Sequence, residues 1–197
     1  MTKKLQEEYK LWGLEINTQK TKYLPIGAEP LNIKIGTDEI EACDRYTYLG
    51  EEFDTTGHSE IKKRITHAKK LIGCLNGIWW SNDIGKRRKH NIYESIIKST
   101  LLYGAETWTI TEKNRKKLEA TEMDVFRRTL GISRMERIRN EEVRLRMGIE
   151  DTIMKDVEHK QLIWYGHVNR MSETRLPKII MEWIPTFRRK RGRPQKT

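Results

Sequence analysis

The chain has 197 residues, of which 36% are hydrophobic and 34% charged, and its mean hydropathy of −0.79 indicates a strongly solvated surface. This length is enough for one ordinary hydrophobic core or two small ones, and six Trp, seven Tyr and three Phe argue against a disordered polymer. With two cysteines, no Cys-x-x-Cys spacing and no apolar run near the ~20 residues of a membrane span, the sequence argues against a disulfide framework, a zinc knuckle and a membrane partner.

The positive charge is unevenly distributed. The formal net charge is +11, and residues 188–197 contribute six positive charges and no acid, so the other 187 residues carry only +5. A charge concentrated in a terminus indicates a polyanionic partner such as nucleic acid, and an inert solvated tail is the alternative.

The N-terminal part predicts a short helix followed by strands. Apolar side chains at helical spacing over residues 5–12 indicate one amphipathic helix that ends at Gly13. Over residues 14–54, short alternating runs separated by Gly, Pro and Asp predict strands, and the run 31–35 is expected to fold back on residues 39–42 as a hairpin.

After residue 57 the apolar period becomes helical. Helices are predicted over residues 59–80, about 85–104, 111–131, 140–147 and 151–171, with a brief last one between Pro177 and Pro185. In the second helix, Ile92, Ile96 and Leu101 are expected to face the core. The Thr111 hydroxyl is expected to cap the first turn of the third helix.

These elements predict an α+β fold. Residues 1–57 form a small antiparallel β region, residues 58–187 a mostly α-helical bundle, and residues 188–197 a basic disordered tail. Most tryptophans lie at helical spacing with aliphatic residues, so core or helix contacts are favoured over base stacking. This interpretation concerns Trp79, Trp80, Trp108, Trp164 and Trp183.

Five strings carry a family resemblance. They are residues 13–23 (GLEINTQKTKY), 48–50 (YLG), 95–108 (SIIKSTLLYGAETW), 130–134 (LGISR) and 164–171 (WYGHVNRM). In this order they resemble the C-terminal part of a non-LTR (LINE-type) retrotransposon reverse transcriptase. The resemblance places the end of the palm and the primer grip in the β region, and the thumb and post-thumb region in the helices.

The resemblance implies RNA-directed DNA polymerase activity with Mg²⁺ and deoxynucleotides in the full-length family. It makes Lys20 the palm-motif lysine beside the triphosphate, and Tyr48, Leu49 and Gly50 a hairpin that grips the primer. From the residues alone, Lys20 can equally be a solvated charge, and Tyr48 and Leu49 can be half-buried sheet packing.

Polymerisation itself is not expected of this chain. Two Mg²⁺ ions held about 4 Å apart by carboxylates would be needed, and the sequence has no Asp-Asp pair. The stretch before Gly13 is too short to contain the family's fingers or first catalytic aspartate. We therefore expect a remnant that binds nucleic acid without polymerising, with no catalytic residue, metal or cofactor of its own.

Two basic clusters are predicted to bind nucleic acid. The first comprises Lys86, Arg87, Arg88 and Lys89 at the start of a predicted helix. The helix dipole disfavours cations there, and a phosphate backbone alongside the helix would favour them. A solvated helix face is the alternative. The second is in the tail and comprises Arg188, Arg189, Lys190, Arg191 and Arg193. Residues 191–194 resemble an AT-hook core, while a nuclear-import signal and a nonspecific tail are alternatives.

The predicted partners are nucleic acid, as an RNA/DNA duplex or DNA, and a full-length polymerase acting in trans. The basic tail and the family favour the nucleus, with the cytoplasm as the alternative. Two other hypotheses stay open: a domesticated nucleic-acid-binding or protein-interaction helical module with an AT-hook-like tail, and a misfolded fragment without function.

Overall fold

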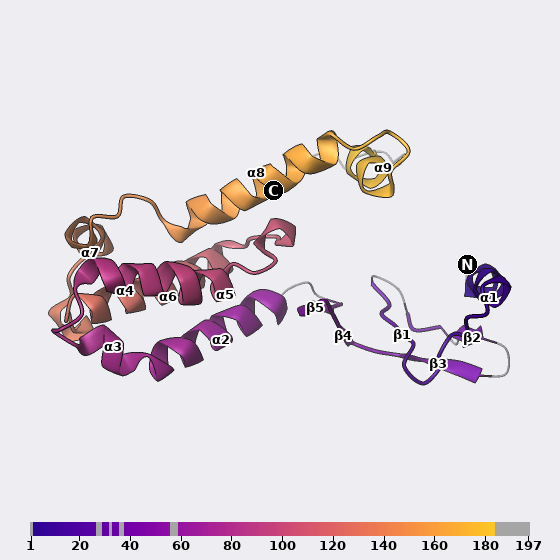
Figure 1. Cartoon of the computed structure of the whole chain (residues 1–197), viewed down its shortest axis with the longest axis horizontal. Helices are drawn as coiled ribbons and strands as arrows, with labels where there is room; N and C mark the ends of the chain where they lie inside the picture. The colour runs from indigo at the N-terminus through magenta and orange to yellow at the C-terminus, as the bar shows by residue number, and fades with distance from the viewer. Residues whose placement is uncertain (1, 27–28, 32, 36–37, 56–58, 184–197) are drawn as a thin grey trace. The chain divides into compact units, whose positions relative to one another are not determined.

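The computed structural model describes residues 2–26, 29–31, 33–35, 38–55 and 59–183. It has the predicted α+β fold, with short strands in the N-terminal part and helices in the remainder (Figure 1). Contacts divide the chain into two compact units, Met1–Lys62 and Lys63–Thr197.

The first unit opens with helix α1 (Thr2–Leu11), which ends where the sequence predicted. Gly13 adopts a left-handed conformation with φ +66°. Its N–H donates to the Lys10 carbonyl at 3.1 Å, and the N–H of Leu14 donates to the Tyr9 carbonyl at 2.9 Å. These two bonds form a Schellman motif, which satisfies the last carbonyls of the helix.

A three-stranded sheet of order β1-β3-β2 follows, built from β1 (Lys22–Tyr23), β2 (Ile33–Ile35) and β3 (Asp38–Ala42). β2 and β3 are antiparallel with Ile33 opposite Ile40, which confirms the predicted hairpin. β1 pairs with β3 in parallel, so the β region is not wholly antiparallel.

A second hairpin joins β4 (Arg45–Tyr48) to β5 (Glu51–Asp54), with Tyr48 opposite Glu51. Its two-residue loop is Leu49 at φ +50° and Gly50 at φ +82°. Two consecutive left-handed residues characterise the type I′ turn, whose twist matches that of the flanking strands.

Helices make up the second unit, and α2 (Ser59–Cys74) runs across the boundary between the units. Then come α3 (Asn76–Trp80), α4 (Lys86–Ile92), the π-helical turn η1 (Tyr93–Lys98), α5 (Ser99–Leu101), the 3₁₀ turn η2 (Ala105–Thr107), α6 (Glu112–Thr129), the 3₁₀ turn η3 (Arg134–Glu136), α7 (Asn140–Met147), α8 (Ile153–Asn169) and α9 (Leu176–Glu182). The helix predicted over residues 59–80 is thus divided at Leu75.

α6 is the central helix of this unit. It contacts α3, α4, α7 and α8, and in Figure 1 it lies with α4 between α3 and α8. The predicted Thr111 cap is confirmed, because its hydroxyl accepts a hydrogen bond from the Asn114 N–H at 3.3 Å. Along α6, Leu118, Val125 and Phe126 are buried in the core.

The prediction that Ile96 faces the core is wrong. Its side chain is 39% exposed, whereas Tyr93, Ile97 and Leu101 are almost fully buried. These three are spaced by four residues along η1 and α5. A π turn holds one more residue than an α turn, so it shifts the buried face by one position, which an α-helical period does not anticipate.

Two of the five tryptophans lie in the core. Trp79 and Trp108 are buried, and the Trp79 indole N–H donates to the Ile72 carbonyl at 3.0 Å. Trp80, Trp164 and Trp183 are exposed and are not core residues. The Trp80 indole N–H donates to Asn76 within α3 at 3.1 Å, and the Trp164 ring lies beside His167 on α8, so these two make contacts within their helices. Within the part of the chain that the structure describes, none of the helices has the length and apolarity to cross a membrane.

Candidate functional site

The predicted cluster at the start of α4 contains one buried lysine. Lys89 is only 5% exposed, and its ammonium donates to the Trp79 carbonyl at 2.7 Å and the Thr129 carbonyl at 3.5 Å. These carbonyls lie in the last turns of α3 and α6. The prediction that Lys89 contacts nucleic acid is therefore wrong, because its charge neutralises the negative ends of two helices.

Other lysines serve helix ends in the same way. Lys86 donates to the Arg146 carbonyl in the last turn of α7 at 2.6 Å. Lys160 donates to the Leu102 carbonyl after α5 at 3.0 Å, and Lys178 to the Asn169 carbonyl that ends α8 at 2.9 Å. Part of the basic composition thus stabilises the bundle itself.

The remaining cations of this region are exposed. Arg87 and Arg88 on α4, and Lys69 and Lys70 on α2, form neither ion pairs nor side-chain hydrogen bonds with described residues. Residues 61–90 contain nine Lys or Arg and a single acid, Asp83. We call Lys69, Lys70, Arg87 and Arg88 the free basic group.

The predicted primer-grip residues lie at the tip of the β4–β5 hairpin. Tyr48 is 59% and Leu49 75% exposed, and Gly50 is exposed beside them. The hairpin therefore presents an aromatic ring at an accessible turn, and the half-buried alternative does not describe these side chains.

Lys20 lies in the turn before β1. Asn17 organises this turn, since its side-chain oxygen accepts from the Lys20 N–H at 3.0 Å and its carbonyl accepts from the Thr21 hydroxyl at 2.7 Å. The Lys20 side chain itself is exposed. Among the described residues there is no cluster of three or more His, Cys, Asp or Glu that could hold a metal ion, so no step through Mg²⁺ can be derived.

The tail cations Arg188, Arg189, Lys190, Arg191 and Arg193 lie outside the described residues. Their predicted role in nucleic-acid binding therefore rests on the sequence alone.

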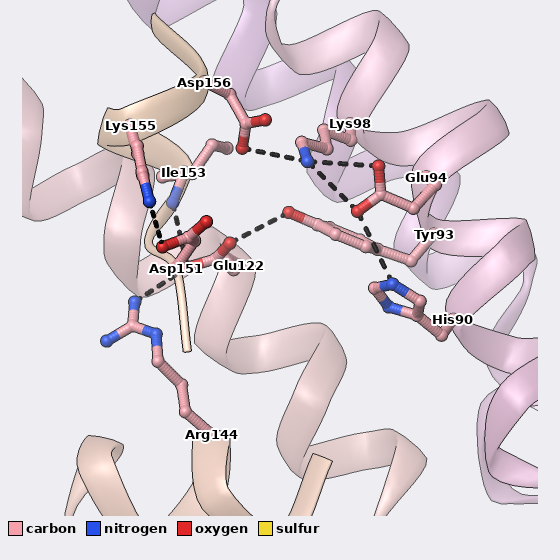
Figure 2. A network of polar contacts seen from close by, with 10 residues as sticks. All are labelled: His90, Tyr93, Glu94, Lys98, Glu122, Arg144, Asp151, Ile153, Lys155 and Asp156. Carbon is pink, nitrogen blue, oxygen red and sulfur yellow. Dashed lines mark hydrogen bonds and ion pairs between the residues drawn. The ribbon is translucent and has the colours of Figure 1, made fainter. Parts of the chain in front are cut away.

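A buried polar network was not anticipated from the sequence (Figure 2). At its centre Glu122 on α6, 3% exposed, accepts from the Tyr93 hydroxyl at 3.1 Å and from Arg144 on α7 at 2.8 Å. It also accepts from the Ile153 N–H at 3.5 Å. Because the N-cap Thr152 provides no side-chain hydrogen bond, Glu122 supplies the missing acceptor at the start of α8.

Burial governs the ionisation of this network. It raises the pKa of Glu122 above its ordinary value of 4.5, although hydrogen bonds and charge from Arg144 act in the opposite direction. Burial also raises the pKa of Tyr93, and the neighbouring carboxylate of Glu122 raises it further. The phenol therefore stays protonated and remains a donor to Glu122.

A separate polar cluster around Lys98 lies nearer the surface. The Lys98 ammonium lies 2.9 Å from Asp156 on α8 and 3.1 Å from Glu94 (Figure 2). Burial lowers the pKa of Lys98, but hydrogen bonds and charge from these two carboxylates outweigh burial and raise it. The Glu122 network joins four helical segments, and the burial of Tyr93 and Glu122 excludes them as groups that a substrate could reach.

One sequence signal could have revealed Glu122. Its position falls between Leu118 and Val125, at spacings of four and three, on the apolar face of the predicted helix. A carboxylate at such a position must find buried partners, because an isolated buried charge is costly.

In the string 164–171, Trp164, Tyr165, His167 and Arg170 are exposed at the C-terminal end of α8, whereas Val168 is buried. A cavity of about 440 Å³ is lined by Trp164, His167, Arg170 and Glu106 among others. The Trp164 and His167 ring centroids are 5.6 Å apart. A Cβ at Gly166 would lie 3.2 Å from the Arg170 guanidinium, so the glycine allows Arg170 to lie close against the helix.

No family model and no solved structure matches the chain. It is similar to a transposon-derived protein of Caenorhabditis elegans, with 29% identity over 185 residues that cover 88% of this chain. The match spans 65% of that relative's length. This similarity supports a transposon-related origin of the chain.

Proposed function

We propose that this transposon-related chain is a nucleic-acid-binding segment of the non-LTR reverse transcriptase type, and that it binds without polymerising by itself. The observation that carries the proposal is the free basic group: four exposed cations without partners among the described residues, in a 30-residue stretch with one acid. Cations of this kind bind phosphates and release counterions.

The order of the five strings supports the family assignment, and the similarity to a transposon-derived protein agrees with it. The exposed hairpin tip at Tyr48 and Leu49 is where the family resemblance puts the primer grip. An aromatic ring at such a tip can pack against sugars or bases. The RNA/DNA duplex is therefore the first substrate to test.

Three further assignments belong to the proposal. We assign the tail residues 188–197 an auxiliary phosphate-binding role, we place the protein in the nucleus, and we expect it to associate with a full-length polymerase that supplies the metal site. Each follows from the charge distribution or from the resemblance.

The test measures affinity by fluorescence anisotropy for an RNA/DNA primer–template and for duplex DNA over a range of salt concentrations. The test variants are Lys69→Gln/Lys70→Gln, Arg87→Gln/Arg88→Gln and a deletion of residues 188–197. The matched control is Lys116→Gln/Lys155→Gln, which removes the same charge from exposed lysines that are paired with Glu112 and Asp151.

On duplex DNA the slope of log affinity against log salt should flatten by about 0.9 for each phosphate that the variant no longer neutralises. We expect flattening in both test pairs and little in the control pair. Equal effects of test and control pairs would show that only the overall charge matters, and an unchanged slope in both test pairs would refute the role of the free basic group. Primer extension by the purified chain with Mg²⁺ and deoxynucleotides would refute the second half of the proposal.

A second candidate is a protein-interaction module, which exposed apolar side chains favour. Those on α8 and α9 include Leu162, Ile163, Tyr165, Ile179 and Ile180. Exposed apolar surface of this kind characterises protein interfaces. A salt slope near zero for all nucleic acids would favour this candidate over the first.

A further inference from the structure

We infer that a cavity formed by the C-terminal half of α6, η3 and the start of α7 binds a phosphate group of a nucleic-acid strand. This inference rests on the proposed nucleic-acid binding and specifies a contact for it. The cavity has a volume of about 350 Å³ and is lined by Arg127, Arg134 and Arg137 together with Asp124 and Asn140.

The charges around the cavity do not balance. Three arginines and one aspartate line it. Asp124 is paired with Arg134, one of the three, at 2.9 Å and with Arg128 at 3.2 Å, so Arg127 and Arg137 have no carboxylate partner among the described residues. Like charges gathered around one cavity repel one another unless an anion lies between them. A guanidinium group can donate two parallel N–H hydrogen bonds to two oxygens of one phosphate, so a phosphate is the anion that fits this cavity best.

Arg127 is held in place for this role. Its Nη2 donates to the Ile138 carbonyl at 2.9 Å and to the Asn140 side-chain oxygen at 2.8 Å. These bonds fix the guanidinium beside the first residue of α7 and leave its other donors available. A site built from positioned side chains loses less conformational entropy when it binds its ligand.

Arg137 lines the cavity in a strained conformation. Its φ is +52°, a left-handed value that a non-glycine residue adopts at a cost of about 1 kcal/mol or more. Its side chain is exposed and has no hydrogen bond or ion pair with described residues. Its backbone N–H donates to the Arg134 carbonyl at 3.3 Å and so ends η3, but this bond does not engage the side chain, whose guanidinium stays available at the cavity.

The start of α7 adds to the positive potential. Its N-cap is Arg139, which offers no side-chain acceptor, and the first backbone hydrogen bond runs from the Val143 N–H to the Arg139 carbonyl. The Asn140 side chain lines the cavity. A helix N-terminus without a capping acceptor favours an anion nearby and so supports the arginines.

The test uses a pair of variants that each remove one positive charge from the same loop. Arg137→Gly removes the cavity guanidinium and relieves the left-handed strain, so the fold should be retained. Arg139→Met is the control, because Arg139 is exposed nearby and does not line the cavity, and methionine introduces no capping acceptor at the start of α7. Both are compared with the wild-type chain for binding to a single-stranded oligonucleotide with and without a 5′-phosphate.

We expect Arg137→Gly to lower affinity about tenfold, as for removal of a charge-assisted hydrogen bond, and Arg139→Met to lower it about twofold or less. If Arg137→Gly lowers the affinity for the 5′-phosphorylated strand alone, the cavity binds a terminal phosphate. If it lowers the affinity for both strands, the cavity binds a phosphodiester. Either result supports the inference.

Equal weakening in the two variants, or wild-type affinity in Arg137→Gly, would overturn it. If the inference fails in this way but nucleic acid still binds through the free basic group, the proposed function is unaffected. Failure of the cavity site can therefore be distinguished from failure of the proposed function. As a second measurement, inorganic phosphate should shift the backbone amide NMR signals of Arg137 and Asn140 in the wild-type chain and should not shift the Asn140 signal in Arg137→Gly. Absence of such shifts in the wild-type chain would contradict the site.

Discussion

The ammonium of Lys89 lies 2.7 Å from the carbonyl oxygen of Trp79, in the interior of the helical unit. A lysine that the sequence placed among phosphate-binding residues is instead a cap for two helices. The same sequence string therefore combines a buried lysine that stabilises the fold with the exposed Arg87 and Arg88, which we propose as phosphate-binding residues.

The first prediction follows from this contact. Lys89→Met keeps the apolar stem but removes the charge, so the Trp79 and Thr129 carbonyls lose their donor. We expect the free energy of unfolding in urea to fall by about 2 kcal/mol. Arg88→Met should leave it nearly unchanged and weaken nucleic-acid binding, whereas a folded Lys89→Met protein should bind as the wild type does. A decrease in affinity without a decrease in stability in Lys89→Met would contradict the assignment.

The second prediction concerns the ion pair between Glu122 and Arg144. Glu122→Gln leaves Arg144 without its carboxylate partner in a largely buried position, and breaking a buried pair costs about 3–5 kcal/mol. The double variant Glu122→Gln/Arg144→Met should recover part of this stability. The measurement is a double-mutant cycle by urea denaturation, with Lys155→Met at an exposed pair as the control. Purely additive effects would show that the two residues do not interact.

The third prediction concerns alkaline pH. Burial and Glu122 raise the folded-state pKa of Tyr93 above the unfolded-state value of 10.0. Above pH 10 the unfolded chain therefore releases the phenol proton while the folded chain keeps it. The contribution of Tyr93 to stability is complete below pH 10 and is lost as the pH rises above this value. Tyr93→Phe should therefore lose less stability than the wild type between pH 9 and about pH 11, the difference approaching ~1.4 kcal/mol per pH unit at the upper end.

Lys98 also has a raised folded-state pKa, so its contribution is lost in the same direction above 10.5. It is present in both proteins of this comparison and therefore cancels in the difference. Urea denaturation at several pH values provides the measurement, and parallel pH profiles for wild type and Tyr93→Phe would refute the role of the phenol.

The fourth prediction tests the hairpin loop. Gly50 has φ +82°, so Gly50→Ala should destabilise the β4–β5 hairpin by about 1 kcal/mol, whereas Leu49→Gly should stabilise it because glycine adopts φ +50° without strain. Gly85→Ala, at φ −62°, is the control. Amide hydrogen exchange of residues 45–54 reports the local stability. Equal protection in the two loop variants would argue against the type I′ turn.

Features that depend on neighbouring residues could be predicted from the sequence. Gly13 ends α1 and Gly131, at φ +69°, ends α6 because left-handed backbone at these positions is available to glycine at little cost. The Thr111 cap and the hairpin of β2 and β3 are likewise local, since an acceptor three residues away or a short turn suffices. The five strings and the charge distribution, which support the functional proposal, also belong to the sequence.

Which polar groups are internal could not be predicted from the sequence, because it depends on how the helices pack. Lys89 meets Thr129 across 40 residues of chain, and Glu122 meets Tyr93 across 29. In the π turn Tyr93 is buried against Glu122 and Phe126 of α6 while Ile96 is exposed, an arrangement that a local period does not encode. The physical reason is that a charged side chain is inexpensive on the surface and costly in the interior without partners, and the sequence does not record where its partners lie.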